Sequence, residues 1–257
     1  MAAAFTSRLT HHAFLNRSIQ LSKPALMSRN GRFCPSIQFN RSVVRHPLSR
    51  ALSTFSPTKK SLGSMAKVDL LQSLPADEVK KVWITHLRDK DALGAVVPSE
   101  TFQKISSRST ESPLFVVPMP FNGGFLSILL QADVKYNDNT IAIHFTRLEM
   151  YQKEGSAAQP ILNLFFFTDF QAAKDIVLMK GEYGFTSSDL TPTQCQQLIQ
   201  LWQMFVLSDK NYELMRKFNH EPSTFKFDDV LDVVRNFSSE GDGGLPNITL
   251  DQRDIKS

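Results

Sequence analysis

The segment Ile161-Leu162-Asn163-Leu164-Phe165-Phe166-Phe167 is the most apolar stretch of this chain, and the fold prediction starts from it. A run of this length fits one buried strand and is far too short to span a bilayer, so we expect no membrane insertion. Three consecutive Phe side chains cannot all face one side of a strand, because successive side chains point to opposite faces. Either protein covers both faces or one face is available to a partner, and we expect helices to cover both.

Four further strand candidates surround this segment. Turn signals such as Asn122-Gly123-Gly124 separate them, and they occupy residues 114–117, 125–132, 141–145 and 176–179. Short connections favour antiparallel neighbours, since parallel strands need a longer crossover. The pattern therefore predicts an α+β fold with a mainly antiparallel central sheet of about five or six strands.

Helical patterns lie before and after these strands in the sequence. Residues 67–90 place the apolar side chains Val79, Val82, Trp83 and Leu87 on one helix face, and a shorter helix is expected from Ser99 to Ser107 with Ser99 as its N-cap. Near the carboxyl end, Thr191-Pro192-Thr193-Gln194 supplies an N-cap, a first-turn Pro and a capping-box Gln. Amino- and carboxy-terminal helices are therefore expected to pack on the sheet.

The amino-terminal part of the chain has a different composition from the rest. The first 68 residues contain seven Arg, four Lys and eleven Ser but no Asp and no Glu. Such a leader is typical of an organelle transit peptide. Chloroplast leaders are usually richer in Ser and poorer in Arg, so the composition favours mitochondria over chloroplasts. The stretch Arg50-Ala51-Leu52-Ser53-Thr54 resembles a plant-type matrix-protease site with cleavage after Leu52.

These observations predict four parts of the chain. We expect a cleaved mitochondrial transit peptide over residues 1–52, a flexible linker over 53–66, a single domain over 67–237 and a flexible tail over 238–257. From Asp69 onward the chain holds 18 basic and 25 acidic residues, a formal net charge of −7. The basic balance of the whole chain thus belongs to the leader, and we expect no nucleic-acid binding.

Residues that could carry chemistry are few. No phosphate-binding loop, dinucleotide fingerprint, zinc-protease motif or nucleophile elbow occurs. Cys195 is the single cysteine after the leader, which suits a reducing compartment, and it lies on the apolar face of an expected helix. His86, His144 and His220 are far apart in the sequence. We interpret all four as structural and expect no catalytic residue, no metal and no cofactor.

Several segments, in order along the chain, carry a resemblance to a known family. They are Pro113–Pro118 followed by Leu129-Leu130-Gln131, then Phe145–Tyr151, Asp175–Glu182 and Phe218–Pro222 leading to Phe225. Together they resemble the Atp11 family, the assembly factors for the catalytic head of mitochondrial ATP synthase. The resemblance covers roughly residues 75–235, and the leader suggests a plant-type member.

The resemblance implies a chaperone without enzymatic activity in the mitochondrial matrix. Family members bind the free F1 β subunit transiently, shield the surface that the α subunit will cover, and leave when α docks. An unassembled β subunit exposes apolar surface, which is an aggregation hazard. We expect a monomer. Two alternatives stay open: a constitutive accessory subunit of a respiratory complex, and a small matrix enzyme with an unrecognised site.

The resemblance also marks candidate partner-binding residues. Gly181 could instead serve a turn, and Asn219 could cap a helix end. Trp83 is added because part of the amino-terminal helix is expected to be exposed. The candidates are Trp83, Pro118, Gln131, Thr146, Lys180, Gly181, Glu182 and Asn219.

Overall fold

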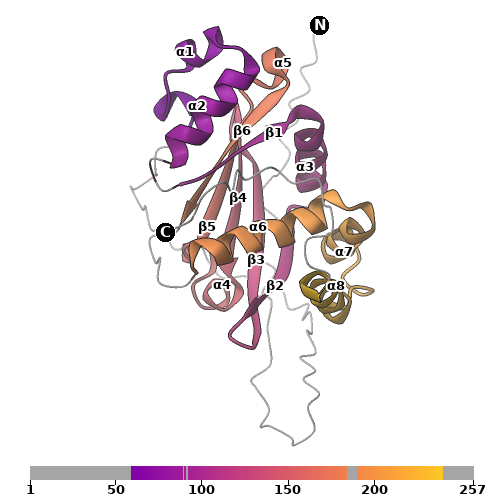
Figure 1. Ribbon diagram of the computed structural model, residues 1–257. Coiled ribbons are helices and arrows are strands. Elements are labelled where there is room, and N and C mark those ends of the chain that lie inside the picture. The colour runs from indigo at the N-terminus through magenta and orange to yellow at the C-terminus, as the bar shows by residue number, and fades with distance from the viewer. Residues whose placement is uncertain (1–58, 89, 91, 184–189, 240–257) are drawn as a thin grey trace, which may run out of the picture. The chain divides into compact units, whose positions relative to one another are not determined.

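A six-stranded antiparallel sheet forms the centre of the computed structural model, which describes residues 59–88, 90, 92–183 and 190–239. Its strands are β1 Leu93–Pro98, β2 Leu114–Phe121, β3 Gly124–Asn137, β4 Thr140–Arg147, β5 Leu162–Phe167 and β6 Ile176–Tyr183. Their order is β1-β6-β5-β4-β3-β2, so β1 and β2 are the two edges (Figure 1). The expected α+β class is confirmed. The expected transit peptide, residues 1–52, lies outside the described residues.

Helices precede, interrupt and follow the strands. They are η1 Leu62–Ser64, α1 Val68–Ser73, α2 Ala76–Arg88, α3 Ser99–Glu111, α4 Leu148–Glu154, η2 Gly155–Ala157, α5 Gln171–Lys174, α6 Pro192–Leu207, α7 Asp209–His220 and α8 Phe227–Ser239. Pro75 divides the helix expected over 67–90 into α1 and α2, because Pro inside a helix lacks the backbone donor and clashes with the preceding turn. None of the helices in the described ranges has the length and hydropathy needed to cross a bilayer.

Local signals in the sequence are reproduced at several points. The Thr191 hydroxyl accepts a hydrogen bond from Gln194 N at 3.2 Å, and Thr191 N donates to Gln194 Oε1 at 2.8 Å, which confirms the capping box of α6. Asn122 and Gly123 both have positive φ, 48° and 77°, as the two-residue turn between β2 and β3 requires. By contrast, α3 is longer than expected, and its N-cap is Pro98, not Ser99.

Strand β1 was not anticipated from the sequence. Its Gly94 and terminal Pro98 weaken a strand pattern, because Gly has no side chain to pack and Pro cannot donate to the ladder. The structure explains Gly94 by close packing. A Cβ at this position would lie 2.7 Å from Leu87 Cδ1 on α2.

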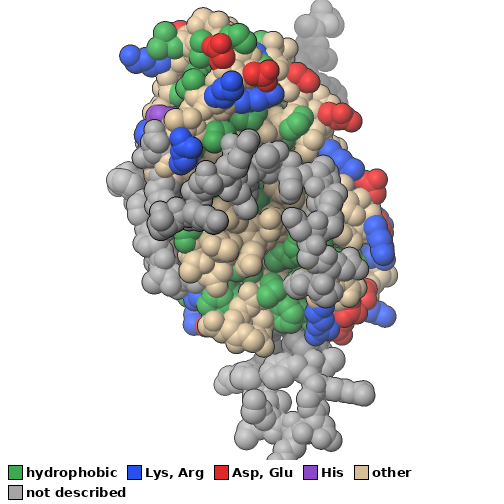
Figure 2. Space-filling model, viewed as in Figure 1, with side chains coloured by type: hydrophobic (Ala, Val, Ile, Leu, Met, Phe, Trp, Pro, Cys, Tyr) green, Lys and Arg blue, Asp and Glu red, His purple; other side chains and the backbone are tan. Residues whose placement is uncertain are grey.

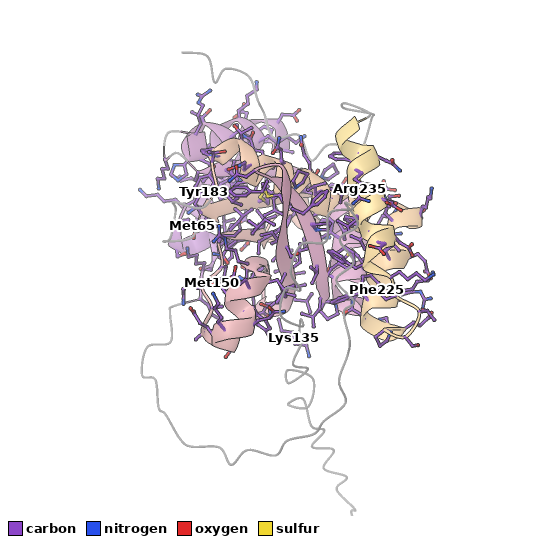
Figure 3. The ribbon with its side chains drawn as sticks, turned by 90° about the horizontal axis from the view of Figure 1, so that it is seen from below. Met65, Lys135, Met150, Tyr183, Phe225 and Arg235 are labelled. Atoms are coloured by element: carbon purple, nitrogen blue, oxygen red, sulfur yellow. The ribbon has the colours of Figure 1, made fainter. Side chains whose placement is uncertain are left out.

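Both faces of the sheet are covered by helices, as the consecutive Phe residues of β5 predicted. Phe166 lies on the first face, with its ring centroid 6.0 Å from that of Trp202 on α6. Phe167 lies on the second face, 6.0 Å from Trp83 on α2. Helices α3, α6, α7 and α8 contribute to the first core, and η1, α1 and α2 to the second. Figure 3 shows Met65 and Phe225 on opposite sides of the sheet.

The described part of the expected linker packs on the second face. Leu62 is 1% exposed and belongs to the same core cluster as Trp83 and Phe165. An apolar side chain buried to this extent keeps the backbone around it in place. Leu62 thus packs with side chains of the expected domain, although it lies in the segment expected as a linker.

Candidate partner-binding surface

A row of polar side chains crosses the second face of the sheet. It consists of Gln131, His144, Asn163 and Glu182, which come from β3, β4, β5 and β6 and lie directly opposite one another in the strand register. All four side chains are partly exposed. This polar row is unusual on a sheet whose surroundings are mostly apolar, and it includes two of the residues singled out from the sequence, Gln131 and Glu182.

The middle of the polar row is held by a short hydrogen bond. His144 Nδ1 lies 2.6 Å from Asn163 Oδ1. An amide oxygen only accepts, so with the amide in this orientation His144 Nδ1 carries the proton. The ring of Tyr136 packs nearby, 6.4 Å from that of His144 and 5.5 Å from that of Phe165. These contacts fix the position of the imidazole.

Two lysines meet the Glu182 end of the polar row. Lys180 Nζ lies 2.7 Å from Glu182 Oε1, and Lys60 Nζ pairs with the other carboxylate oxygen. Lys60 also donates its backbone N–H to the Tyr136 hydroxyl at 3.1 Å. Burial raises the pKa of Glu182, but the hydrogen bonds and charges of Lys180 and Lys60 outweigh it and leave the pKa below its ordinary value. Glu182 is therefore an ionised anchor for both lysines.

Four of the sequence-derived candidates are buried. Trp83 does not lie on the exposed part of its helix: it is 1% exposed and its indole donates to Met179 O at 3.0 Å. The neighbouring Val82, expected on the buried stripe, is instead 46% exposed. Pro118 and Thr146 are also buried. Their side chains pack within this protein.

Gly181, the fourth buried candidate, lies inside β6 and does not form a turn. It pairs with Leu93 of β1, and a Cβ on it would lie 2.8 Å from Leu93 Cβ and 3.3 Å from Leu164 Cδ2. Real Cβ atoms essentially never approach another atom as closely as 2.8 Å, and 3.3 Å is tighter than most Cβ contacts. Gly181 is required for the close approach of the strands.

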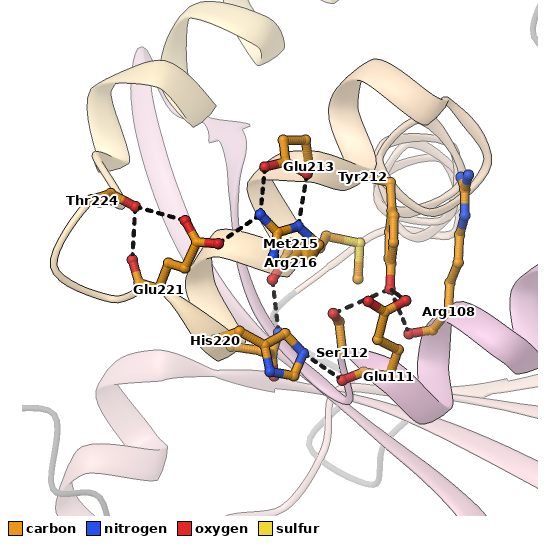
Figure 4. A network of polar contacts seen from close by, with 11 residues as sticks. Arg108, Glu111, Ser112, Tyr212, Glu213, Met215, Arg216, His220, Glu221 and Thr224 are labelled. Atoms are coloured by element: carbon orange, nitrogen blue, oxygen red, sulfur yellow. Dashed lines mark hydrogen bonds and ion pairs between the residues drawn. The ribbon is translucent and has the colours of Figure 1, made fainter.

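Asn219 belongs to a polar joint between α3, β2 and α7. Its amide bonds to the backbone of Leu114, and the adjacent His220 Nε2 lies 2.9 Å from Glu111 O. The Tyr212 hydroxyl contacts Glu111 Oε2 at 2.8 Å and Ser112 Oγ at 3.2 Å (Figure 4). The family-like segment Phe218–Pro222 thus holds a helix to an edge strand.

Arg216 links Glu213 and Glu221 at the end of this joint. Its guanidinium makes two bonds of 2.9 Å to the Glu213 carboxylate and one of 2.7 Å to Glu221, whose backbone oxygen accepts from the Thr224 hydroxyl (Figure 4). The hydrogen bond from Arg216 keeps the pKa of Glu213 below its ordinary value. These contacts lie at the surface and shape the turn after α7.

The described residues also include a cysteine and potential metal ligands. Cys195 is buried, and burial raises the pKa of its thiol to about 11, so little thiolate forms near neutral pH. Within the described ranges, no three His, Cys, Asp or Glu side chains come close enough together to hold a metal ion.

Sequence reasoning missed part of the surface. It interpreted His144 as structural and did not consider Asn163, Tyr136 or Lys60. Each of these residues is unremarkable in its own segment, and the polar row becomes visible only when the register of four strands is known. The sequence did carry one signal. Asn163 and His144 are each a polar residue in an otherwise apolar strand segment, at positions where alternation places the side chain on a defined face.

Comparison with known proteins places the chain in a family. The model of the ATP11 protein family matches residues 36–231. The ATP synthase mitochondrial F1 complex assembly factor 1 of Danio rerio is 34% identical over 186 residues, which cover 72% of this chain and 58% of the relative. The Mus musculus protein of the same name is 28% identical over 232 residues, covering 89% and 66%.

A fungal relative extends the comparison. The protein named Protein atp11, mitochondrial, of Schizosaccharomyces pombe is 26% identical over 239 residues, covering 82% of each chain. The chain therefore spans only 58% and 66% of the two vertebrate relatives but most of the fungal one. Since the family model matches well over half of the sequence, this chain belongs to the ATP11 protein family.

Proposed function

We propose that this protein is an assembly factor for the F1 part of mitochondrial ATP synthase. In this proposal it is a chaperone that binds the free β subunit, shields the α-facing surface of that subunit from aggregation and is released when the α subunit docks. The observation that carries the proposal is the match to the ATP11 family over residues 36–231, together with relatives named F1 complex assembly factors.

The described surface offers the kind of contact that such a chaperone needs. Leu70 on α1 is 61% exposed, Val82 on α2 is 46% exposed and Phe125 at the β2–β3 turn is 42% exposed. Figure 2 shows hydrophobic side chains scattered among charged ones at the end formed by α1 and α2. A mixed surface of this kind supports a moderate affinity of this protein for the β subunit. The affinity must be moderate, because the β subunit has to leave for its permanent partner.

The contact with the β subunit is proposed to involve the polar row. Gln131, Lys180 and Glu182 are the sequence-derived candidates whose side chains reach solvent on the second face, and His144 lies between them. Trp83, Pro118, Thr146 and Gly181 are buried and are proposed to support this face without direct contact to the client, and Asn219 is proposed to hold the strand at its margin. The list of direct contacts is thus narrower than the eight sequence-derived candidates.

The remaining parts of the proposal follow from the leader and the family. The protein acts in the mitochondrial matrix after removal of residues 1–52, without catalysis or a cofactor, and as a monomer that meets its client transiently. An accessory subunit of a respiratory complex is the competing function, and it differs by remaining in the finished complex in fixed proportion.

Co-expression tests the proposal. Residues 53–257 are produced together with the F1 β subunit, and the soluble fraction of β is measured with and without the α subunit. We expect β to stay soluble only with this protein and α to displace it. If β aggregates regardless, the chaperone function is wrong, and if the protein stays bound after α docks, the accessory-subunit function replaces it.

A variant pair tests the location of the contact in the same assay. Gln131→Arg changes a partly exposed member of the polar row, and Gln159→Arg makes the same change at an exposed position after η2. We expect only Gln131→Arg to lower the soluble fraction of β. Equal effects of both variants would contradict the placement on the polar row.

A further inference from the structure

The methionines in the part of the chain that the structure describes fall into two groups. Two are partly exposed: Met65, between η1 and α1, and Met150 on α4. The buried ones are Met119, Met179, Met204 and Met215. Peroxides convert the thioether of methionine into a sulfoxide, and access to the sulfur controls how readily they do so. Met65 and Met150 are therefore the described methionines that a peroxide in solution reaches most easily.

Met65 lines an open hollow at the surface of the second face. The hollow has a volume of about 710 Å³ and is lined by Gly63 and residues 65–70. A space of this size holds many molecules as small as water, whose share of the liquid volume is about 30 Å³. Hydrogen peroxide is only one oxygen atom larger than water, so it reaches the Met65 side chain from solvent.

The Met65 sulfur already has a hydrogen-bond donor. Lys180 Nζ donates to Met65 Sδ at 3.4 Å and also lies 2.7 Å from Glu182 Oε1. A thioether sulfur is a weak acceptor, whereas an ammonium group has three N–H donors. Lys180 can therefore serve the sulfur and the carboxylate at the same time. Among the described residues, no hydrogen bond to the Met150 side chain is found, so the two accessible methionines differ in this respect.

We propose that Met65 is an oxidation site for hydrogen peroxide and that Lys180 accommodates the sulfoxide. A sulfur lone pair attacks one peroxide oxygen, and the O–O bond breaks. The sulfur loses two electrons and keeps the attacked oxygen. The other oxygen takes up the proton of the attacked one and leaves as water. Lys180 then donates a hydrogen bond to the sulfoxide oxygen.

The position of Met65 makes this donor important. Its side chain packs against the second core, next to side chains such as Leu62 and Phe165 (Figure 3). Oxidation places a polar oxygen on a side chain that was apolar, and a polar atom without a partner beside a core is destabilising. A hydrogen bond from a charged donor is among the stronger ones in proteins, so Lys180 offsets this cost. The site involves no client and stands independently of the proposed function.

Peptide mapping of the full chain tests the reactivity. The protein is treated with hydrogen peroxide, and the sulfoxide at each methionine is followed by mass spectrometry over time. We expect Met65 to be oxidised about tenfold or more faster than Met119 and Met179, whose reaction requires local opening of the fold. Met150 is the internal control for an accessible methionine. Oxidation of Met65 as slow as that of the buried methionines overturns the proposal.

The role of Lys180 is tested by a cycle of variants that all carry Met150→Leu, so that Met65 is the accessible methionine of the described chain. Urea midpoints are compared before and after a treatment that stops before the buried methionines react. We expect oxidation to lower the midpoint more in Lys180→Leu than in the chain that keeps Lys180. Lys153→Leu, at an exposed position of α4, is the control and should respond like the chain with Lys180. Equal losses in Lys180→Leu and Lys153→Leu overturn the accommodation by Lys180.

A spectroscopic measurement decides the same point if Lys180→Leu does not fold. The nitrogen resonance of the Lys180 ammonium is recorded by NMR before and after oxidation of the unchanged chain. We expect it to shift on oxidation, because its acceptor changes from sulfur to oxygen, and to stay in place in Met65→Leu treated in the same way. An unchanged resonance in the oxidised parent, or an equal shift in Met65→Leu, overturns the proposed hydrogen bond.

Discussion

Asn219 bonds to both backbone groups of Leu114, although the two residues are 105 positions apart in the sequence. Asn219 Nδ2 donates to Leu114 O at 2.6 Å, and Leu114 N donates to Asn219 Oδ1 at 3.2 Å. A third bond, from Nδ2 to Met215 O at 2.8 Å, fixes the direction of the amide. The side chain thereby takes the place that a peptide group of a neighbouring strand would occupy, and it joins α7 to the first residue of β2.

Replacing Asn219 with Ala should destabilise the protein. The change leaves the N–H and C=O of Leu114 without partners in a half-buried position, and we expect the free energy of unfolding to fall by about 1–3 kcal/mol. Urea denaturation measures the change. Lys210→Ala, at an exposed position of the same helix, should stay within about 0.5 kcal/mol of the parent. A loss no larger for Asn219→Ala than for Lys210→Ala would contradict the role of the clamp.

Adding one methyl group at Gly181 should also be costly. The new Cβ would meet Leu93 Cβ at 2.8 Å, so β1 or β6 must shift, and we expect Gly181→Ala to lower the free energy of unfolding by about 1–3 kcal/mol. Gly63→Ala is the matched control, because the nearest atom to its Cβ is Val68 Cγ2 at 4.0 Å. Similar unfolding midpoints for the two variants would show that the strands are not packed this closely.

Neighbouring positions on α2 should differ in how strongly a substitution changes the stability. Trp83→Phe keeps most of the buried ring but removes the donor to Met179 O, and we expect a loss of about 1–3 kcal/mol in the free energy of unfolding. Val82→Ala, at the 46% exposed position beside it, should change that free energy by less than about 0.5 kcal/mol. Thermal or urea unfolding separates the two. A larger loss for Val82→Ala would mean that α2 presents its other face to the sheet.

The contribution of Glu182 should depend on pH. The pKa of this carboxyl is lowered in the folded protein from the ordinary value of 4.5, so the folded state favours the ionised form. Its stabilisation is fully present above the unfolded-state pKa and is lost as the pH falls through the folded-state pKa. Glu182→Gln should therefore be less stable than the parent by about 1 kcal/mol at pH 7, with a difference that shrinks below pH 4.5.

Denaturation of the parent and Glu182→Gln at pH 7 and at pH 4 or lower measures this dependence. Glu154→Gln, an exposed change at the end of α4, is the control and should show a small difference at both pH values. Added salt should reduce the Glu182 effect at pH 7, because ions screen the pairs with Lys180 and Lys60. A difference that grows toward low pH would reverse the sign and contradict the ion-pair account.

Local patterns in the sequence determined much of the architecture. The apolar run at residues 161–167 favoured cover on both faces, the Asn122-Gly123 turn fixed one hairpin, and Thr191 with Gln194 marked the start of α6. Each of these signals depends on residues within one turn or one strand of each other, where backbone geometry alone imposes the outcome. The antiparallel sheet followed from the short connections.

Only the tertiary structure decided which residues share a surface. Gln131, His144, Asn163 and Glu182 form a row because four strands pair in one register. Trp83 is buried because α2 turns that side toward β6. Residues 93–98 form β1 because they pair with β6, a segment distant in the sequence. These features depend on contacts between segments that are distant in the sequence, so a pattern within a single segment does not reveal them.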